Sequence, residues 1–166
     1  MEWQVSRNGS LVLESCTVRA ALGRSGVTKA SNKREGDGAT PLGQYPLRRV
    51  LYRADRVAQP QTSLPCRALR RDDGWCDAPD DPAYNRPVRL PYPASHEVLW
   101  REDGLYDIIL VIGHNDDPPE PGAGSAIFLH CKRDDYAPTE GCVALDAGDV
   151  RSLLATARPG DLLRID

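Results

Sequence analysis

Alternating apolar and polar residues open the chain and predict a β-hairpin. Trp3 and Val5 alternate with polar residues before the Asn-Gly pair at 8–9, and residues 10–13 repeat the alternation. An Asn-Gly pair between two such runs favours a two-residue turn, in which both central residues have positive φ. The sequence CTVRAAL at 16–22 predicts a third strand.

Further apolar runs of strand length predict the rest of a sheet. The run LYDIILVIG has the length and composition of a central buried strand. In SAIFLHC, alternation places Phe128 and His130 on one face and Ile127 and Leu129 on the other. The predicted strands cover residues 45–53, 97–100, 105–113, 125–131 and 161–166.

Three polar segments separate these runs. Residues 23–44 are rich in Gly and Ser and predict a long loop, which in compact domains is usually functional or mobile. Residues 55–96 carry many Pro and Asp, and we expect an irregular excursion there, without a second domain. Residues 115–124 predict a turn-rich loop.

Only one segment has helical periodicity. Val150, Leu153, Leu154 and Ala157 follow the i, i+3, i+4, i+7 pattern, with Asp149 as the expected N-cap. The fold class is therefore mainly β with one short C-terminal helix. A length of 166 residues predicts a single domain over 1–166.

Composition and charge narrow the possible partners. The formal net charge is −3, so we expect no basic face for nucleic acid. No apolar run approaches the roughly 18 residues of a membrane span. Met1 is followed directly by Glu2, Trp3 and Gln4, so no signal peptide is visible in this sequence.

We expect the protein to be a monomer. Because the number of cysteines is odd, at least one of them is then without a disulfide partner. No CxxC pair is present, which argues against a structural zinc site. Cys66 and Cys76 could form a disulfide or remain two free thiols, and the sequence leaves both readings open. The five cysteines are Cys16, Cys66, Cys76, Cys131 and Cys142.

The segment HCKRDDYAPTEGCVAL contains the parts needed for acyl transfer. A cysteine attacks as a thiolate, and a neighbouring imidazole such as His130 can accept the Cys142 proton and leave an ion pair. Gly141 leaves room for a substrate. We expect the free amides of Gly141 and Cys142 to act as oxyanion donors, with the Thr139 hydroxyl beside them.

Other readings of these residues remain. Free cysteines are usually buried packing residues, and we assign that role to Cys131, which alternation points to the opposite face. His114, in GHNDD, is a second candidate base that we expect at the same end of the sheet. A zinc deaminase is excluded, because HCK lacks the glutamate of H-x-E and no P-C-x-x-C follows.

Two separated motifs resemble the YkuD-like L,D-transpeptidases. SAIFLH…YAPTEGCVAL is similar to the catalytic segment of that family, and KREGDGATPLGQYPL to a segment that many members carry nearer the N-terminus. GWCDAPDDPAYNRPV and LYDIILVIGHN resemble intervening blocks of one branch. The resemblance covers most of residues 28–146, and the order of two motifs makes it specific.

The resemblance implies a YkuD-like β-sandwich that acts on peptidoglycan stem peptides in the periplasm or cell envelope. Cys142 would attack the diaminopimelate carbonyl of a donor tetrapeptide, release D-alanine and pass the acyl group to an amine of a second stem. His130 would carry the protons, oriented by a backbone carbonyl. The resemblance also implies that no metal or organic cofactor is required and that the enzyme contributes to cell-wall synthesis and cell shape. Carbapenems acylate the cysteine of many members.

Several further residues are candidates for substrate binding. Arginines could pair a stem carboxylate bidentately, although surface arginines are as often only solvated. The candidates are Arg133, Arg86, Asn85, Tyr84, His114 and Asn115, together with Thr139.

The sequence also departs from the family pattern. Many members carry His where Glu140 stands, and Arg shortly after the cysteine, near Ala144. The standard link between two position-three residues is therefore open, and L-alanine at position one is another possible acceptor. An L,D-carboxypeptidase, in which water takes the thioester, and a non-catalytic wall-binding module are the alternative functions.

Overall fold

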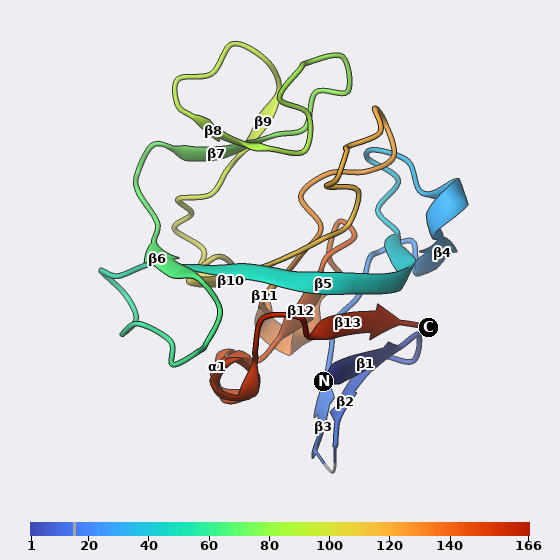
Figure 1. Cartoon of the computed structure of the whole chain (residues 1–166), viewed down its shortest axis with the longest axis vertical. Coiled ribbons are helices and arrows are strands. Elements are labelled where there is room, and N and C mark those ends of the chain that lie inside the picture. Colours follow the sequence, from blue (N-terminus) through green and yellow to red (C-terminus); the bar gives the residue numbers. More distant parts are fainter. Residues whose placement is uncertain (15) are drawn as a thin grey trace.

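The computed structural model describes residues 1–14 and 16–166, which form mostly strands with one short helix near the C-terminus (Figure 1). The largest sheet has the strand order β12-β11-β10-β5-β13-β1-β2-β3, with β4 and β6 paired to β5. Its strands are β1 (Glu2–Ser6), β2 (Ser10–Leu13), β3 (Cys16–Arg19), β4 (Val27–Lys29), β5 (Thr40–Tyr52), β6 (Cys66–Ala68), β10 (Ile108–Ile112), β11 (Phe128–Cys131), β12 (Val143–Leu145) and β13 (Leu162–Ile165).

The long strand β5 joins the two halves of this sheet. Its first half pairs antiparallel with β13, and its second half pairs antiparallel with β10. The sheet curls until the segment after β3 meets β12, where Ala21 and Ala144 exchange backbone hydrogen bonds of 2.8 and 2.9 Å. This sandwich, closed like a barrel, confirms the predicted fold class.

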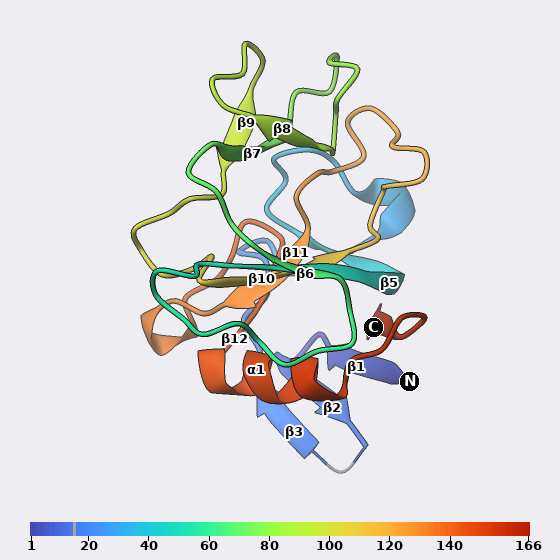
Figure 2. The same cartoon turned by 60° about the vertical axis from the view of Figure 1, so that its left-hand side comes forward.

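The helix α1 (Ala147–Thr156) lies below the sheet (Figure 2). Its buried residues Val150, Leu153 and Leu154 belong to the core of the main sheet. The helical periodicity is confirmed, but the predicted N-cap is wrong. Asp146 is the cap, and its side chain accepts a hydrogen bond from the amide of Gly148 at 2.9 Å. Asp149 lies inside the first turn, where the backbone is already helical.

The N-terminal hairpin forms as predicted, but its turn differs. The loop has three residues, 7–9, and of the Asn-Gly pair only Gly9 has positive φ, at 81°. A three-residue hairpin loop needs one left-handed residue at its last position, which Gly9 supplies. A side chain there would also meet the carbonyl oxygen of Ala20, 2.8 Å from an added Cβ.

Residues 55–96 are more regular than the sequence indicates. Together with the residues just beyond, they contain a second sheet of three strands, ordered β8-β7-β9, which we call the cap sheet. Its strands of three or four residues are too short to show a period. The strands are β7 (Asp73–Cys76), β8 (Pro87–Arg89) and β9 (His96–Val98).

The cap sheet stands over the main sheet and contacts it through an aromatic pair. The rings of Trp75 and Phe128 meet edge to face with their centroids 5.0 Å apart. Both side chains are almost fully buried, and burial of a side chain of this kind stabilises the fold by about 1.5–3 kcal/mol. The cap sheet, drawn above the main sheet in Figure 1, is therefore anchored on β11 by this ring contact.

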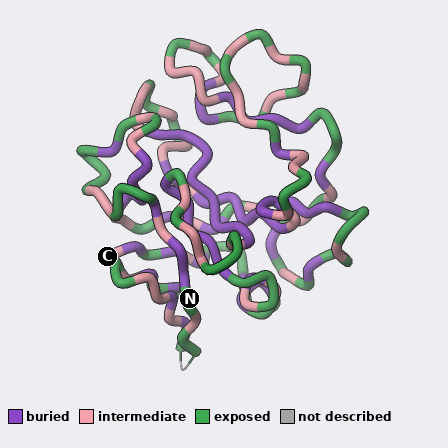
Figure 3. Tube along the Cα trace, turned by 180° about the vertical axis from the view of Figure 1, so that it is seen from behind, coloured by how far each residue is buried: buried purple, intermediate pink, exposed green. Residues whose placement is uncertain are grey.

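The predicted loop at 23–44 also carries structure. It contains β4, the 3-10 helix η1 (Ala30–Asn32) and the first residues of β5, which pairs with β4. A second 3-10 helix, η2 (Asp134–Tyr136), follows β11. Buried residues concentrate in the central strands, whereas the outer loops are largely exposed (Figure 3).

The cysteines are spread over the fold. Cys66 on β6 and Cys76 on β7 are both free thiols. Cys131 packs into the large core between the sheet halves, as alternation predicts. Within residues 1–14 and 16–166, no helix has the length and apolar character needed to cross a membrane.

Candidate active site

Strand register brings the predicted nucleophile and base to the same face. β11 and β12 are parallel, and His130 pairs with Ala144. Cys142 precedes Ala144 by two residues, so its side chain lies on the face that His130 and Phe128 share. Cys142 and Phe128 belong to the cluster under the cap sheet. The face predicted for His130 is thus confirmed.

The Cys142 sulfur is held by two backbone groups. Sγ accepts a hydrogen bond from the amide of Phe128 at 3.3 Å and donates one to the carbonyl of Ala126 at 3.2 Å. Burial raises the pKa of Cys142 to about 12, and the nearby carboxylate of Glu97 acts in the same direction. The thiol is therefore protonated near neutral pH.

His130 is oriented by its own strand. Its Nδ1 lies 2.8 Å from the carbonyl oxygen of Cys131, and in the neutral ring this contact assigns the proton to Nδ1 and the lone pair to Nε2. Burial lowers the pKa of His130 to about 4. The resting pair is consequently a neutral thiol and a neutral imidazole, and the ion pair with Cys142 is not the resting state.

The turn before the nucleophile is built around one glycine and one hydroxyl. Gly141 has a φ of 128°, and an added Cβ would lie 2.9 Å from the carbonyl oxygen of Ala39. Its amide donates to the Thr139 hydroxyl at 3.1 Å, and that hydroxyl donates to the carbonyl of Cys142 at 2.7 Å. The prediction of a free Gly141 amide is therefore wrong, because the threonine two residues earlier closes the turn.

Cys142 and His130 open onto one cavity of about 380 Å³, which we call the active-site cavity. Carboxyl and cationic groups both line it, as a substrate with carboxylates and an amine requires. Some lining residues come from the cap sheet and others from the loops around the catalytic strands. They include Lys33, Glu35, Asp77, His96, Glu97, Arg101, Tyr106, Ser125, Arg133, Thr139 and Glu140.

The cationic side chains of this cavity differ in whether they already form ion pairs within the protein. Lys33 is buried and bound to Asp37, and Arg101 contacts Asp103 at 2.5 Å. Arg133 lines the cavity and forms no ion pair within the part of the chain that the structure describes. Of the arginines predicted to hold a stem carboxylate, Arg133 is therefore the one beside the nucleophile.

Sequence reasoning missed a hydrogen-bonded pair, the half-buried Glu97 and the buried Tyr106, next to His130. Glu97 on β9 accepts a hydrogen bond from the hydroxyl of Tyr106, and the Tyr106 ring meets the His130 ring edge to face at 5.2 Å. Burial raises the pKa of Glu97. No spacing rule connects these residues, because the cap sheet alone brings β9 over the start of β10.

Three predicted substrate residues lie away from Cys142. Asn85, Arg86 and His114 line a second cavity, and Asn85 donates to the carbonyl of His114 at 3.0 Å. His114 does not lie in the lining of the active-site cavity, so the structure does not place it as a second base there. Its Nε2 instead contacts the carbonyl of Ala123 at 3.1 Å.

Tyr84 and Asn115 support loops. The Tyr84 hydroxyl donates to Glu35 at 2.5 Å and accepts from the amide of Gly124 at 3.0 Å. The Asn115 side-chain amide donates to the carbonyl of Gly124 at 3.0 Å. Tyr84 therefore joins the loop after β10 to Glu35, whereas Asn115 closes that loop on itself, and neither residue lines the active-site cavity.

The residues that depart from the family pattern flank the nucleophile. Glu140 forms an ion pair with Arg24 at 2.8 Å, and both side chains are largely exposed, so the pair adds little stability. Ala144 also lines the cavity. The neighbourhood of Cys142 thus holds the carboxylate of Glu140 and no cation at position 144.

A scan against protein-family models identifies the family to which this chain belongs. The model of the L,D-transpeptidase catalytic domain, YkuD, matches residues 3–165, which is nearly the whole chain. The chain therefore belongs to the YkuD family of L,D-transpeptidase catalytic domains, whose members act on peptidoglycan peptides and are typically associated with the cell envelope. No curated protein and no solved structure gave a significant match.

Proposed function

We propose that this protein is a peptidoglycan L,D-transpeptidase in which Cys142 is the nucleophile and His130 the general base and acid. The observation that carries the proposal is the joint placement of the Cys142 thiol and the His130 imidazole on one cavity, inside a chain of this family. We further propose that it works in the cell envelope, contributes to cell-wall synthesis and cell shape, and is acylated by carbapenems.

The first half-reaction forms a thioester. Nε2 of His130 accepts the thiol proton as Sγ of Cys142 attacks the diaminopimelate carbonyl of the donor stem. The carbon–nitrogen bond to D-alanine then breaks, and His130 gives its proton to the leaving amine. A neutral resting pair suits this sequence, because the proton moves during attack and no buried ion pair must be maintained beforehand.

Stabilisation of the oxyanion falls mainly to one amide. The Gly141 amide is engaged by the Thr139 hydroxyl, so we assign the Cys142 amide as the oxyanion donor at the turn. Thr139 acts as a positioning residue, since its hydroxyl accepts from the amide of Gly141 and donates to the carbonyl of Cys142 itself. Arg133 is the proposed partner for a stem carboxylate.

The second half-reaction passes the acyl group to an amine. His130 deprotonates the acceptor amine, which attacks the thioester and restores the thiol. Ala144 and Glu140 leave the cavity beside Cys142 less cationic, which favours an acceptor that presents an ammonium group with few carboxylates nearby. The L-alanine amine of an unsubstituted stem satisfies this requirement, whereas the diaminopimelate amine carries a carboxylate on the same carbon. The cross-linked product decides between these two acceptors.

The experiment that tests the function incubates the purified chain with disaccharide-tetrapeptide muropeptides, alone and together with free tetrapeptide stems whose L-alanine amine is unsubstituted, and separates the products by tandem mass spectrometry. We expect a cross-linked dimer and released D-alanine, and neither with Cys142→Ala. Fragment ions would identify the acceptor amine. Tripeptide without dimer would instead show the carboxypeptidase, and no product from a folded protein would contradict both activities and leave the binding module.

A further inference from the structure

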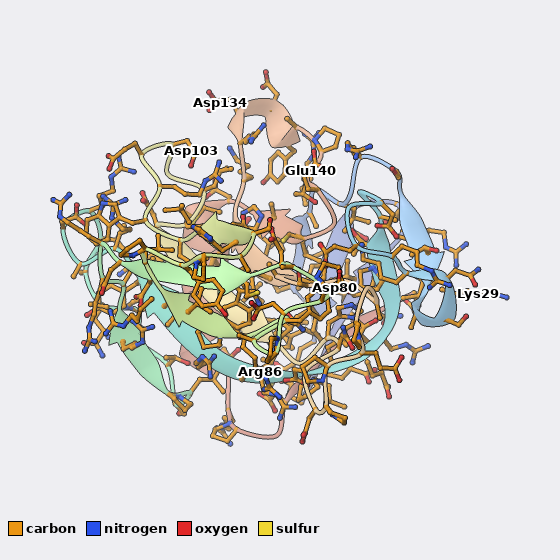
Figure 4. The ribbon with its side chains drawn as sticks, turned by 90° about the horizontal axis from the view of Figure 1, so that it is seen from above. Lys29, Asp80, Arg86, Asp103, Asp134 and Glu140 are labelled. Carbon is orange, nitrogen blue, oxygen red and sulfur yellow. The ribbon has the colours of Figure 1, made fainter. Side chains whose placement is uncertain are left out.

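A second cavity of about 310 Å³ lies on the other side of the Trp75–Phe128 contact, and we call it the arginine cavity. Ile127 lines both cavities, but Cys142 and His130 line only the active-site cavity. In Figure 4, Glu140 beside the nucleophile and Arg86 of the arginine cavity lie on opposite sides of the cap sheet. The cap sheet thus stands between two separate hollows.

Local backbone structure concentrates arginines in this cavity. The register between β5 and β10 shifts at Val111 and Ile112, which face Arg49 and Leu47, so Arg48 is the extra residue of a β-bulge. A bulge redirects side chains that would otherwise alternate between faces. Arg48 and Arg49 consequently line the same cavity, and Arg86 reaches it from the residue before β8.

Two of the cations near this cavity already have partners. Arg48 binds Asp116 through two hydrogen bonds of 2.8 and 3.1 Å. Arg67, behind Arg49, binds Asp73 at 2.7 and 3.3 Å. These bidentate contacts use up the carboxylates that face them.

Arg49 and Arg86 have no such partner. Within residues 1–14 and 16–166, neither guanidinium forms an ion pair or donates a side-chain hydrogen bond. Arg49 is half-buried, with its guanidinium 5.8 Å from the centre of the Trp75 ring. Burial and the nearby Arg67 and Arg86 lower the pKa of Arg49.

A half-buried cation with unpaired donors is costly unless a ligand pairs with it. We propose that the arginine cavity binds a small oxyanion group, a carboxylate or a phosphate, through the guanidinium groups of Arg49 and Arg86. Two guanidinium forks facing one hollow suit a planar or tetrahedral oxyanion, which accepts several N–H donors at once. Two carboxylates also line the cavity: Asp116 is paired with Arg48, and Asp117 opposes an anion at its edge of the site.

His114 and Asn85 shape this site without adding charge. Burial lowers the pKa of His114 to about 4, so its ring is neutral near pH 7. Asn85 accepts a hydrogen bond from Nε1 of Trp75 at 2.9 Å and thereby fixes the indole under Arg49. The binding proposed for this cavity is independent of the reaction at Cys142.

The test follows the arginine Nε–Hε signals of the whole chain by nuclear magnetic resonance at low ionic strength. One titration uses inorganic phosphate and the other N-acetyl-D-alanine, which carries a peptide-like carboxylate. We expect saturable shifts of the Arg49 and Arg86 signals with at least one probe. The probe that saturates identifies whether a phosphate or a carboxylate group is the natural ligand.

Variants separate this site from general charge effects. Arg86→Gln, at an exposed position, should weaken binding about tenfold, while the matched control Arg158→Gln leaves the affinity unchanged. Arg49→Lys keeps the positive charge but loses the bidentate hydrogen-bonding geometry of the guanidinium group, and it should also weaken binding. Shifts that never saturate, or equal affinities for Arg86→Gln and the unaltered chain, would overturn the proposal.

Discussion

The hydroxyl of Tyr106 donates a hydrogen bond to the carboxylate of Glu97 directly beside the imidazole of His130. Glu97 belongs to the cap sheet, whereas His130 belongs to the main sheet. The contact therefore connects the two sheets at the point where proton transfer is proposed. It also keeps a carboxyl group close enough to raise the pKa of Cys142.

Replacement of Glu97 by Gln should make the Cys142 thiol more reactive. The glutamine retains an acceptor for Tyr106 but removes the charge that opposes a thiolate, so the pKa of Cys142 falls. In the His130→Gln background, where attack depends on the thiolate fraction, we expect alkylation of Cys142 by iodoacetamide to accelerate by about 3- to 10-fold near pH 8, which corresponds to up to one pKa unit. Peptide mass spectrometry measures Cys142 separately from the exposed Cys16.

Glu120→Gln is the matched control for that change. Glu120 is exposed in the loop after β10 and outside the active-site cavity. Its variant should leave the alkylation rate unaltered. An equal acceleration in both variants would show that net charge, and not the placement of Glu97, controls the thiol.

Replacement of His130 by Gln should change the pH dependence of Cys142 alkylation. With a base whose pKa is about 4, the rate should stay nearly level above about pH 5 and fall as His130 becomes protonated. Without the base, attack depends on the small thiolate fraction, so the rate should rise about tenfold per pH unit. We expect the variant to be about 100-fold slower at pH 7.

The rate profile is measured between pH 4 and 9, with circular dichroism as the check on folding. Identical profiles for both proteins would remove His130 from its proposed role. A decline centred near pH 6.5 in the unaltered chain would contradict the buried, neutral state of the imidazole.

The two buried histidines should make the protein sensitive to acid. Burial lowers the pKa of His114 and of His130 to about 4, whereas an unfolded histidine titrates near 6.5. Between these values the unfolded chain binds more protons, so the free energy of unfolding falls as the pH falls from 6.5 to 4. Each histidine should contribute a loss of about 3 kcal/mol across that window.

Urea unfolding at pH 7 and at pH 4.5 measures this loss. His114→Gln and His130→Gln should each reduce the difference between the two pH values, and the double variant should reduce it by the sum, because the histidines line different cavities. An undiminished difference in both single variants would assign the acid sensitivity to other groups.

Removal of the cap of α1 should destabilise the protein. Asp146→Ala loses the hydrogen bond to the amide of Gly148, and we expect the free energy of unfolding to fall by about 1 kcal/mol. Asp149→Ala removes only a favourable charge in the first turn, worth about 0.3–1 kcal/mol at most. Urea denaturation compares them, and a larger loss for Asp149→Ala would reverse the assignment of the cap.

The strands that carry the catalytic residues were predictable because their patterns are simple. The buried run around Ile108–Ile112 and the alternation through Phe128 and His130 both appear as expected. Cys131 falls on the opposite face for the same reason. Periodicity of two residues needs only local sequence, so these assignments do not depend on the rest of the fold.

The features that were not predictable depend on long-range contacts. Glu97 and Tyr106 meet only because a sheet of very short strands folds over β11. Arg48 shares a cavity with Arg49 through a bulge that no local pattern indicates. The hydrogen bond from the Gly141 amide to the Thr139 hydroxyl could have been predicted from the sequence, because a threonine two residues before an amide is a common turn signal.

The antiparallel bridge between Ala21 and Ala144 ties the segment after the N-terminal hairpin to the strand that follows Cys142, and a parallel bridge joins Gly23 to Thr139. The turn that presents Cys142 is thus braced by residues made more than a hundred positions earlier. Contacts of such sequence separation form late, because a long loop must close before they stabilise the chain. The turn that carries Cys142 therefore reaches its observed position only once residues 21–23 have paired with the segment around it.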